Sequence, residues 1–329
     1  MHFAVYLPLV VPVLAALAAR PLADRLPPAA ATWLLAASAI VLALASSAVL
    51  GMLALSALVR IPVIDAVAHL SGPVIRSSDA VSVPVAIVAG GLLVMATVAA
   101  GRAVWRRGRA IAAAHRHASS LPGVGQVVVT EDTAADAYTL PGWPCRIVIT
   151  QGMLRALSAG ERGVLLAHER SHARGSHYLF TSAARLAAAA NPLLRPVAAQ
   201  TGYTVERWAD ERAASQAGDR TLAARAIARA ALATSAAPPG RDAAMTALGL
   251  ITQEREHRAD SRRADPHRAD LHRAGQVPRR VAALLAPPPR LPLLLLAASI
   301  VLVAVSGAAA LEAARNLHQL IELAQGQPA

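Results

Sequence analysis

The sequence predicts an integral-membrane α-helical protein with four transmembrane helices and one mainly α, α+β domain outside the spans. Hydrophobic residues make up 55% of its 329 residues and charged residues only 16%, so much of the chain is apolar surface that must be buried. Four windows contain no Asp, Glu or Arg, and crossing a bilayer takes about 20 such residues. The windows are 1–19, 26–59, 80–101 and 291–311.

The predicted membrane part consists of three spans before a long polar segment and one span after it. The approximate bounds are 3–19, 31–58, 81–101 and 291–311, and a short tail follows at 312–329. A signal peptide is the alternative interpretation of the first window. That window lacks a basic start and carries Pro8 and Pro12 inside its apolar run, so we interpret it as a span.

Arginine placement predicts the orientation of this multi-pass protein in the cell membrane. The net charge is +12, and all 32 basic residues are arginine. Several of them flank the polar segment 102–290 near the third and fourth spans: Arg102, Arg106, Arg107, Arg109, Arg116, Arg279, Arg280 and Arg290. Because arginine is enriched in cytoplasmic loops, the segment is predicted to be cytoplasmic. No motif that reads bases is present, so we expect no direct binding of nucleic acid.

Short β-branched runs in the polar segment predict a small sheet, which helices follow. Strands are expected at 126–130, 137–140 and 147–150. Ser158 and Glu161 form a capping-box pattern, which predicts a helix from about residue 159 to about residue 175. Further helices are expected at about 178–190, 203–217 and 221–237. Residues 254–275 repeat R-A-D at a five-residue period, which indicates a low-complexity insertion.

The helix expected from about residue 159 to about residue 175 carries the motif A-H-E-R-S-H, which contains His168, Glu169 and His172. Residues four apart share one face of a helix, so both imidazoles can point at one metal ion. Zinc accepts histidine nitrogens at about 2.1 Å, and H-E-x-x-H is typical of zincin peptidases. Glu169 is turned off the ligand face, where it can take a proton from a metal-bound water as general base. The motif therefore predicts a catalytic zinc site.

A catalytic zinc needs a third protein ligand, for which the sequence offers two candidates. The metzincin extension of the motif would place a histidine at position 178, where this chain has Tyr178. His177 misses that position by one residue, which turns a side chain on a continuous helix by ~100°. The other candidate is Glu206, which a returning helix would bring beside the motif. Asp210, one turn further on, would then accept a hydrogen bond from a ligand imidazole.

The segment from Ile147 to Asp210 resembles known membrane metallopeptidases. It contains I-V-I-T, then the run from Gln151 to His172, then N-P-L from Asn191 and E-R-W-A-D from Glu206. It is similar to peptidases related to HtpX and the CAAX prenyl protease, and more similar to the antibiotic-sensing BlaR/MecR group. That group has three spans before its protease domain and one after. Only residues 312–329 follow the last span, so the group's extracellular penicillin-binding sensor domain is expected to be absent.

The resemblance implies a zincin-like protease domain of the gluzincin type with Zn²⁺ as its cofactor. It implies that His168, His172 and Glu206 are the zinc ligands. It also implies that Glu169 is the catalytic base and that Asp210 lies behind a ligand as its hydrogen-bond partner. The resulting hypothesis is a membrane-embedded zinc endopeptidase with residues 102–290 as its protease domain.

The expected partners are protein or peptide substrates and the lipid bilayer, and the BlaR/MecR resemblance adds a cytoplasmic DNA-binding repressor as a substrate. Two other functions remain open. One is a non-proteolytic membrane receptor or scaffold that keeps the zincin fold, and the other is HtpX-like quality control of membrane proteins. An intramembrane protease is disfavoured because Arg162, Arg170 and Arg174 surround the motif, which lies outside every charge-free window.

Overall fold

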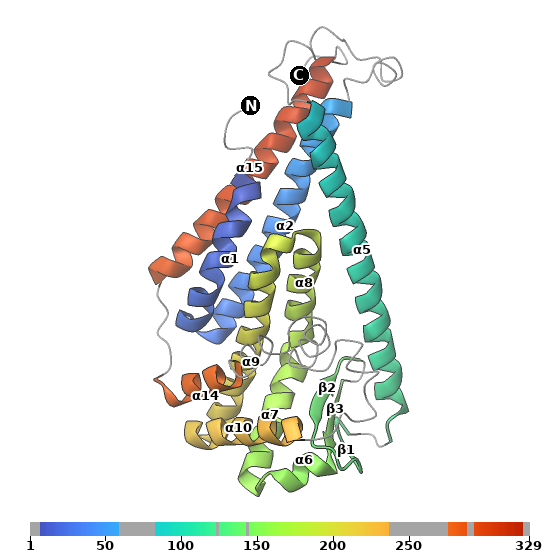
Figure 1. Ribbon diagram of the computed structural model, residues 1–329. Coiled ribbons are helices and arrows are strands. Elements are labelled where there is room, and N and C mark those ends of the chain that lie inside the picture. The colour runs from blue at the N-terminus through green and yellow to red at the C-terminus, as the bar shows by residue number, and fades with distance from the viewer. Residues whose placement is uncertain are drawn as a thin grey trace.

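The computed structural model describes residues 7–58, 83–122, 125–142, 145–236, 276–287 and 293–324. Its four long apolar helices are α1 (Leu7–Arg25), α2 (Pro28–Leu58), α5 (Val83–Ser120) and α15 (Leu293–Ala324), and each is long and apolar enough to cross a membrane. They form the upper part of the molecule, and the strands and shorter helices form the lower part (Figure 1). The four predicted apolar helices are therefore confirmed, and they indicate a multi-pass membrane protein.

Helix α5 continues well past residue 101, where the sequence predicts the end of the third span, and reaches Ser120. Its extension buries Ala110, Ala114 and Ala118, which are four residues apart and so lie on one helix face. Ala114 and Ala118 pack against the buried sheet residues Tyr138 and Val148. The expected boundary at residue 102 thus falls inside a continuous helix that joins the third span to the sheet.

The predicted sheet is confirmed, and its strands are β1 (Val127–Thr130), β2 (Ala137–Leu140) and β3 (Arg146–Thr150). Their order is β1-β3-β2, with β3 parallel to β1 and antiparallel to β2. The central strand β3 is buried along its whole length. Because β3 is the central strand, β2 occupies an edge of the sheet.

Further helices follow the sheet along the chain: α6 (Gln151–Ala156), α7 (Ala159–Gly175), α8 (His177–Ala190), η2 (Pro192–Leu194), α9 (Arg195–Ala217), α10 (Arg220–Ala236) and α14 (Gln276–Leu285). The predicted α7, α8 and α10 are confirmed. Helix α9 begins eight residues before the expected residue 203, because Pro196 fits the first turn of a helix. The predicted insertion 254–275 lies outside the described residues.

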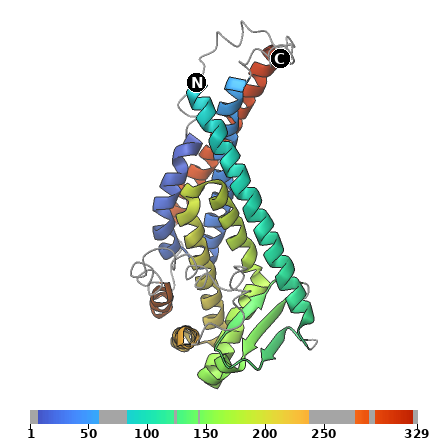
Figure 2. The same cartoon turned by 45° about the vertical axis from the view of Figure 1, so that its right-hand side comes forward.

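Helices α8 and α9 form a hairpin that reaches up among the spans (Figures 1 and 2). Small and branched side chains of the hairpin, including Ala184, Ala187 and Val197, pack in one buried cluster with Leu35 and Leu42 of α2. At the hairpin tip, the Asn191 amide donates a hydrogen bond to the Ser46 hydroxyl of α2 at 3.1 Å. Small residues allow this close approach between helices. The segment 102–290 is therefore not wholly separate from the membrane part.

Two further hydrogen bonds tie the middle of α9 to the first two spans. The Thr32 hydroxyl of α2 donates to the Thr204 hydroxyl at 3.0 Å, and both side chains are fully buried. The Arg207 guanidinium donates to the carbonyl oxygen of Ala23, on α1, at 2.6 Å. Both bonds lie within two residues of Glu206, so the spans fix the part of α9 that carries this candidate ligand.

Candidate active site

Helix α7 begins where the capping box predicts. The backbone N–H and the hydroxyl of Ser158 both donate to the Glu161 carboxylate at 2.9 Å. Glu161 is almost fully buried and also pairs with Arg229 of α10 at 3.0 Å, so the first turn of α7 is held to a second helix. Burial alone would raise the pKa of Glu161, but these hydrogen bonds and the Arg229 charge lower it. Helix α7 is thereby fixed from its first residue.

His168 and His172 on α7 converge with Glu206 on α9. The two Nε2 atoms lie 3.1 Å apart. The Glu206 carboxylate oxygens lie 3.6 Å from Nε2 of His168 and 3.6 Å from Nε2 of His172. Ligand atoms at about 2.1 Å around a tetrahedral zinc ion are separated by about 3.4 Å, so this spacing fits zinc. Among the residues that the structure describes, these three form the group suited to hold a metal ion.

Asp210 lies behind the first ligand, as the spacing on α9 predicts. Its Oδ1 atom is 2.9 Å from Nδ1 of His168, the nitrogen that faces away from the ligand group. A carboxylate in this position keeps the proton on Nδ1 and leaves Nε2 free to bind a metal. Asp210 is only 1% exposed, so it needs a positive partner of its own.

Arg280, on α14, is that partner. Its guanidinium donates to both carboxylate oxygens of Asp210 at 2.7 Å, and it lies 3.2 Å from Glu206. The sequence predicts Arg280 only as one of the arginines that orient the fourth span. The structure instead buries it in the zinc site. Arg280 shares a helix face with Val277, Val281 and Leu284, which pack in the core, but this pattern alone does not distinguish an arginine that binds a carboxylate from one that orients a span.

Replacing Arg280 with methionine is expected to lower the stability of the zinc-free protein by about 3–5 kcal/mol, because two buried carboxylates lose their cation. Thermal unfolding of the detergent-solubilised full chain measures this effect. The adjacent Arg279 provides the control, since it pairs with the exposed Asp24 and lies over the Tyr203 ring. Arg279→Met should cost about 1–2 kcal/mol. Equal losses in the two variants would contradict a structural role for Arg280 in the site.

Glu169 lies on the side of α7 that faces the sheet. It is 7% exposed, and its Oε2 atom lies 2.8 Å from the hydroxyl of Thr139 on β2. The same hydroxyl lies 3.1 Å from the backbone oxygen of Glu169. Burial raises the pKa of Glu169 above its ordinary value, even though His168 and Thr139 act in the opposite direction. A raised pKa suits a carboxylate that takes up a proton during a reaction.

Buried charges set the protonation of the ligand group. Burial alone would lower the pKa of His168, but its contacts with Asp210 and Glu206 raise it to about 10. Burial lowers the pKa of His172 to about 4. Burial would raise the pKa of Glu206, but His172, which is charged at low pH, together with Arg280 and His168 lowers it. Without metal, His168 therefore carries a proton on both ring nitrogens. A zinc ion would take the place of the proton on Nε2, while the proton on Nδ1 stays towards Asp210.

The other residues considered from sequence lie around this group. His177 is not a ligand but contacts the second ligand, since its Nδ1 atom lies 3.0 Å from Nδ1 of His172. Burial lowers the pKa of His177 to about 3. Cys145 donates to the carbonyl oxygen of Leu140 at 3.2 Å, and burial raises its pKa. The Thr139 contact was missed, because nothing in a single strand sequence marks which hydroxyl meets α7.

A mainly helical fold with four apolar helices and a His-His-Glu cluster defines a membrane zinc metallopeptidase. The sequence model of Peptidase family M48 matches residues 102–287, more than half of the chain. The chain belongs to Peptidase family M48, a family of zinc metalloendopeptidases, and His168, His172 and Glu206 form its metal site. Searches among curated proteins and among solved structures gave no match.

Proposed function

We propose that this enzyme hydrolyses peptide bonds of protein substrates with Glu169 as the general base. The carrying observation is the position of Glu169, which is buried next to the ligand His168 and bonded to Thr139. Zinc bound by His168, His172 and Glu206 would polarise the scissile carbonyl and acidify a water molecule. Glu169 would take a proton from the attacking water and pass it to the leaving amine, and Asp210 would keep His168 in the tautomer that binds the metal.

The substrate binds, in this proposal, as an extended strand on the edge of β2. This strand pairs only with β3 among the described strands, and it carries Thr139, the partner of Glu169. Backbone groups on a free edge bind an extended peptide through hydrogen bonds that do not depend on its sequence. The site therefore accepts a segment of a protein chain, which suits an endopeptidase. Zinc removal by a chelator should abolish cleavage of such a substrate, and added Zn²⁺ should restore it.

We infer from the arginines that residues 102–290 form a cytoplasmic protease domain, between three spans in residues 1–101 and a fourth span at 291–311. Labelling of introduced cysteines in a Cys145→Ser background tests this orientation. Arg155→Cys, on an exposed part of α6, should react with a membrane-impermeant thiol reagent only after permeabilisation. Ser78→Cys, between the second and third spans, should react in intact cells. The reverse pattern would place the protease domain outside the cell.

The finer proposal is a BlaR/MecR-like role in signalling, in which the substrate is a cytoplasmic DNA-binding repressor. It rests on the similarity of residues 147–210 to that group and on the arrangement of three spans before the protease and one after. An inert Glu169→Gln enzyme should retain its substrates for crosslinking in cells. Capture of a transcription factor supports the proposal. Capture of unfolded membrane proteins alone would favour HtpX-like quality control, and no capture would favour the non-proteolytic alternative.

A further inference from the structure

His177 is a buried histidine that none of the proposed chemical steps uses. It is the first residue of α8 and is 2% exposed. Its ring lies between two other rings, with centroid distances of 4.9 Å to His172 and 4.7 Å to Trp208. The residue before the turn is Gly175, where a Cβ atom would come within 2.4 Å of Nε2 of His177. A side chain at this position would displace the ring, so the end of α7 and the start of α8 fit closely around His177.

The contact between the two histidines fixes where their protons lie. Nε2 of His172 faces the ligand group, since it is 3.1 Å from Nε2 of His168. A histidine that binds zinc through Nε2 carries its proton on Nδ1. That N–H points at Nδ1 of His177, 3.0 Å away, which must accept it and therefore carries no proton. His177 is then the neutral tautomer with its hydrogen on Nε2.

We propose that His177 is a positioning residue, which fixes the tautomer and ring orientation of the zinc ligand His172. It would do for the second ligand what Asp210 does for the first, but with a neutral acceptor in place of a carboxylate. The Trp208 ring, tilted by 37° against the imidazole, and the space left by the missing side chain of Gly175 hold the acceptor in place. This inference rests on the zinc site of the proposed enzyme and on His172 as a ligand, and it does not depend on which substrate is cut.

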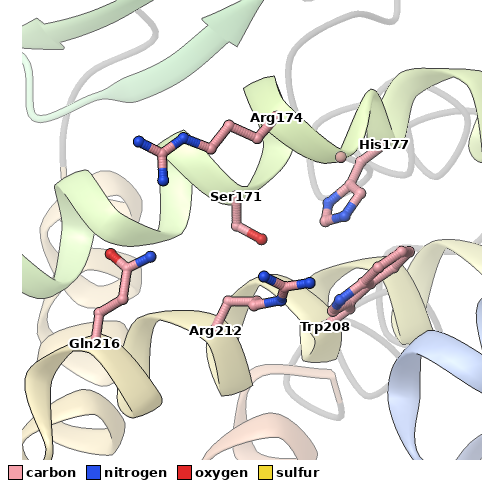
Figure 3. Close-up of a pocket in the computed structure, with 7 residues that line it drawn as sticks. Ser171, Arg174, His177, Trp208, Arg212 and Gln216 are labelled. Carbon is pink, nitrogen blue, oxygen red and sulfur yellow. The ribbon is translucent and has the colours of Figure 1, made fainter.

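A pocket beside His177 makes the proposal testable. The pocket has a volume of about 280 Å³ and is lined by Ser171, Arg174, Gly175, His177, Trp208, Arg212 and Gln216. Ser171 and Arg174 lie on α7, His177 begins α8, and Trp208, Arg212 and Gln216 lie on α9. Figure 3 shows that the His177 ring points across the gap towards Trp208. Arg174, Arg212 and Gln216 are exposed, so the pocket is accessible from solvent. A small ring can therefore reach the space that a shortened His177 side chain would vacate.

The first experiment compares two substitutions in the full chain, purified in detergent and loaded with zinc. His177→Asn keeps an acceptor oxygen near the position of Nδ1, whereas His177→Leu fills the space without an acceptor. We expect zinc to leave His177→Leu about 10–100-fold faster than the wild type, and to leave His177→Asn within about threefold of the wild-type rate. Transfer of zinc to a chromophoric chelator measures the rates, and the visible spectrum of the Co²⁺ form reports the ligand geometry. Equal losses in the two variants would overturn the proposal.

The second experiment tests the acceptor directly and does not depend on a stable leucine variant. His177→Ala should lose zinc fast, and added imidazole should slow the loss by entering the pocket and accepting from His172. Pyrrole is the control, because it has a similar ring and an N–H group but no free acceptor nitrogen. Wild-type protein in imidazole controls for direct binding of imidazole to zinc. Rescue by pyrrole as good as that by imidazole would reduce His177 to a packing role.

These outcomes separate this inference from the proposed function. If the wild type holds zinc but cleaves no protein, the proposed hydrolysis fails, while the retention of zinc still reports on His177. If hydrolysis is confirmed but neither His177→Asn nor imidazole added to His177→Ala retains zinc, the proposed peptidase function holds and the positioning role of His177 is wrong.

Discussion

Glu169→Gln is expected to keep zinc bound while peptide hydrolysis falls by roughly two to four orders of magnitude. Glutamine has nearly the same size as glutamate, and its amide oxygen can still accept from the Thr139 hydroxyl, which lies 2.8 Å from the carboxylate. The side chain should therefore stay in place. It cannot take up the proton of a zinc-bound water, so only the base is lost.

The measurement pairs a hydrolysis assay with zinc analysis of the same preparation. Glu131→Gln, in an exposed loop, carries the same chemical change away from the site and should leave both readings unchanged. Loss of zinc from Glu169→Gln would mean that the side chain holds the metal site together. Full activity without Glu169 would remove it from the catalytic step and favour another base.

Glu206→Ala is expected to lose most of the bound zinc, because it removes one of three protein ligands and leaves two histidines. It also removes one of the two carboxylates that Arg280 contacts in the cluster and leaves Asp210, so the balance of charge at the site changes as well. His168→Ala and His172→Ala should lose zinc to a similar extent. Metal analysis of the purified proteins measures the loss.

A control from the same helix is available in Glu211→Ala. Glu211 follows Asp210 but pairs with Arg220 at the other side of α9, at 2.5 Å, and it is not part of the ligand group. This variant should retain its zinc. If Glu206→Ala keeps as much zinc as Glu211→Ala, a group other than Glu206 completes the site.

The metal-binding motif and its helix could be predicted from sequence because their signals are local. The capping box at Ser158 fixes the start of α7, and the four-residue spacing fixes the shared face of His168 and His172. Glu206 needed one further step, a returning helix after the break at Asn191. That step holds because Asn191 caps a single turn, η2, after which α9 runs back to α7.

The prediction for His177 rested on a wrong assumption about the backbone. The prediction that His177 misses the metal assumed that α7 continues unbroken to that residue. In the structure Ser176 has a φ of 47°, a left-handed conformation that ends α7, and His177 begins α8. The ring then turns back towards His172. A single backbone torsion decides this contact, and residue spacing on a helix carries no information about it.

Arg280 could not be assigned for a different reason. Beside a transmembrane segment, an arginine that orients the protein and one that clamps a carboxylate have the same sequence context. The hairpin of α8 and α9 posed a similar difficulty, since its alanine-rich faces contain too few consecutive apolar residues to be recognised as membrane-facing. Its place among the spans depends on contacts with α1 and α2 that only the folded chain displays.

Because of the hydrogen bonds on either side of Glu206, a movement of the first two spans also moves α9 and the zinc ligand that it carries. Thr204 is fastened to α2 and Arg207 to α1, while the next turn carries Asp210. A helix is stiff, so a tilt of about 3° in the spans moves Asp210, about 9 Å along α9 from Thr204, by about 0.5 Å. Catalytic groups tolerate displacements of only about 0.5 Å. The geometry of the metal site is thus set partly by how the first two spans lean in the bilayer.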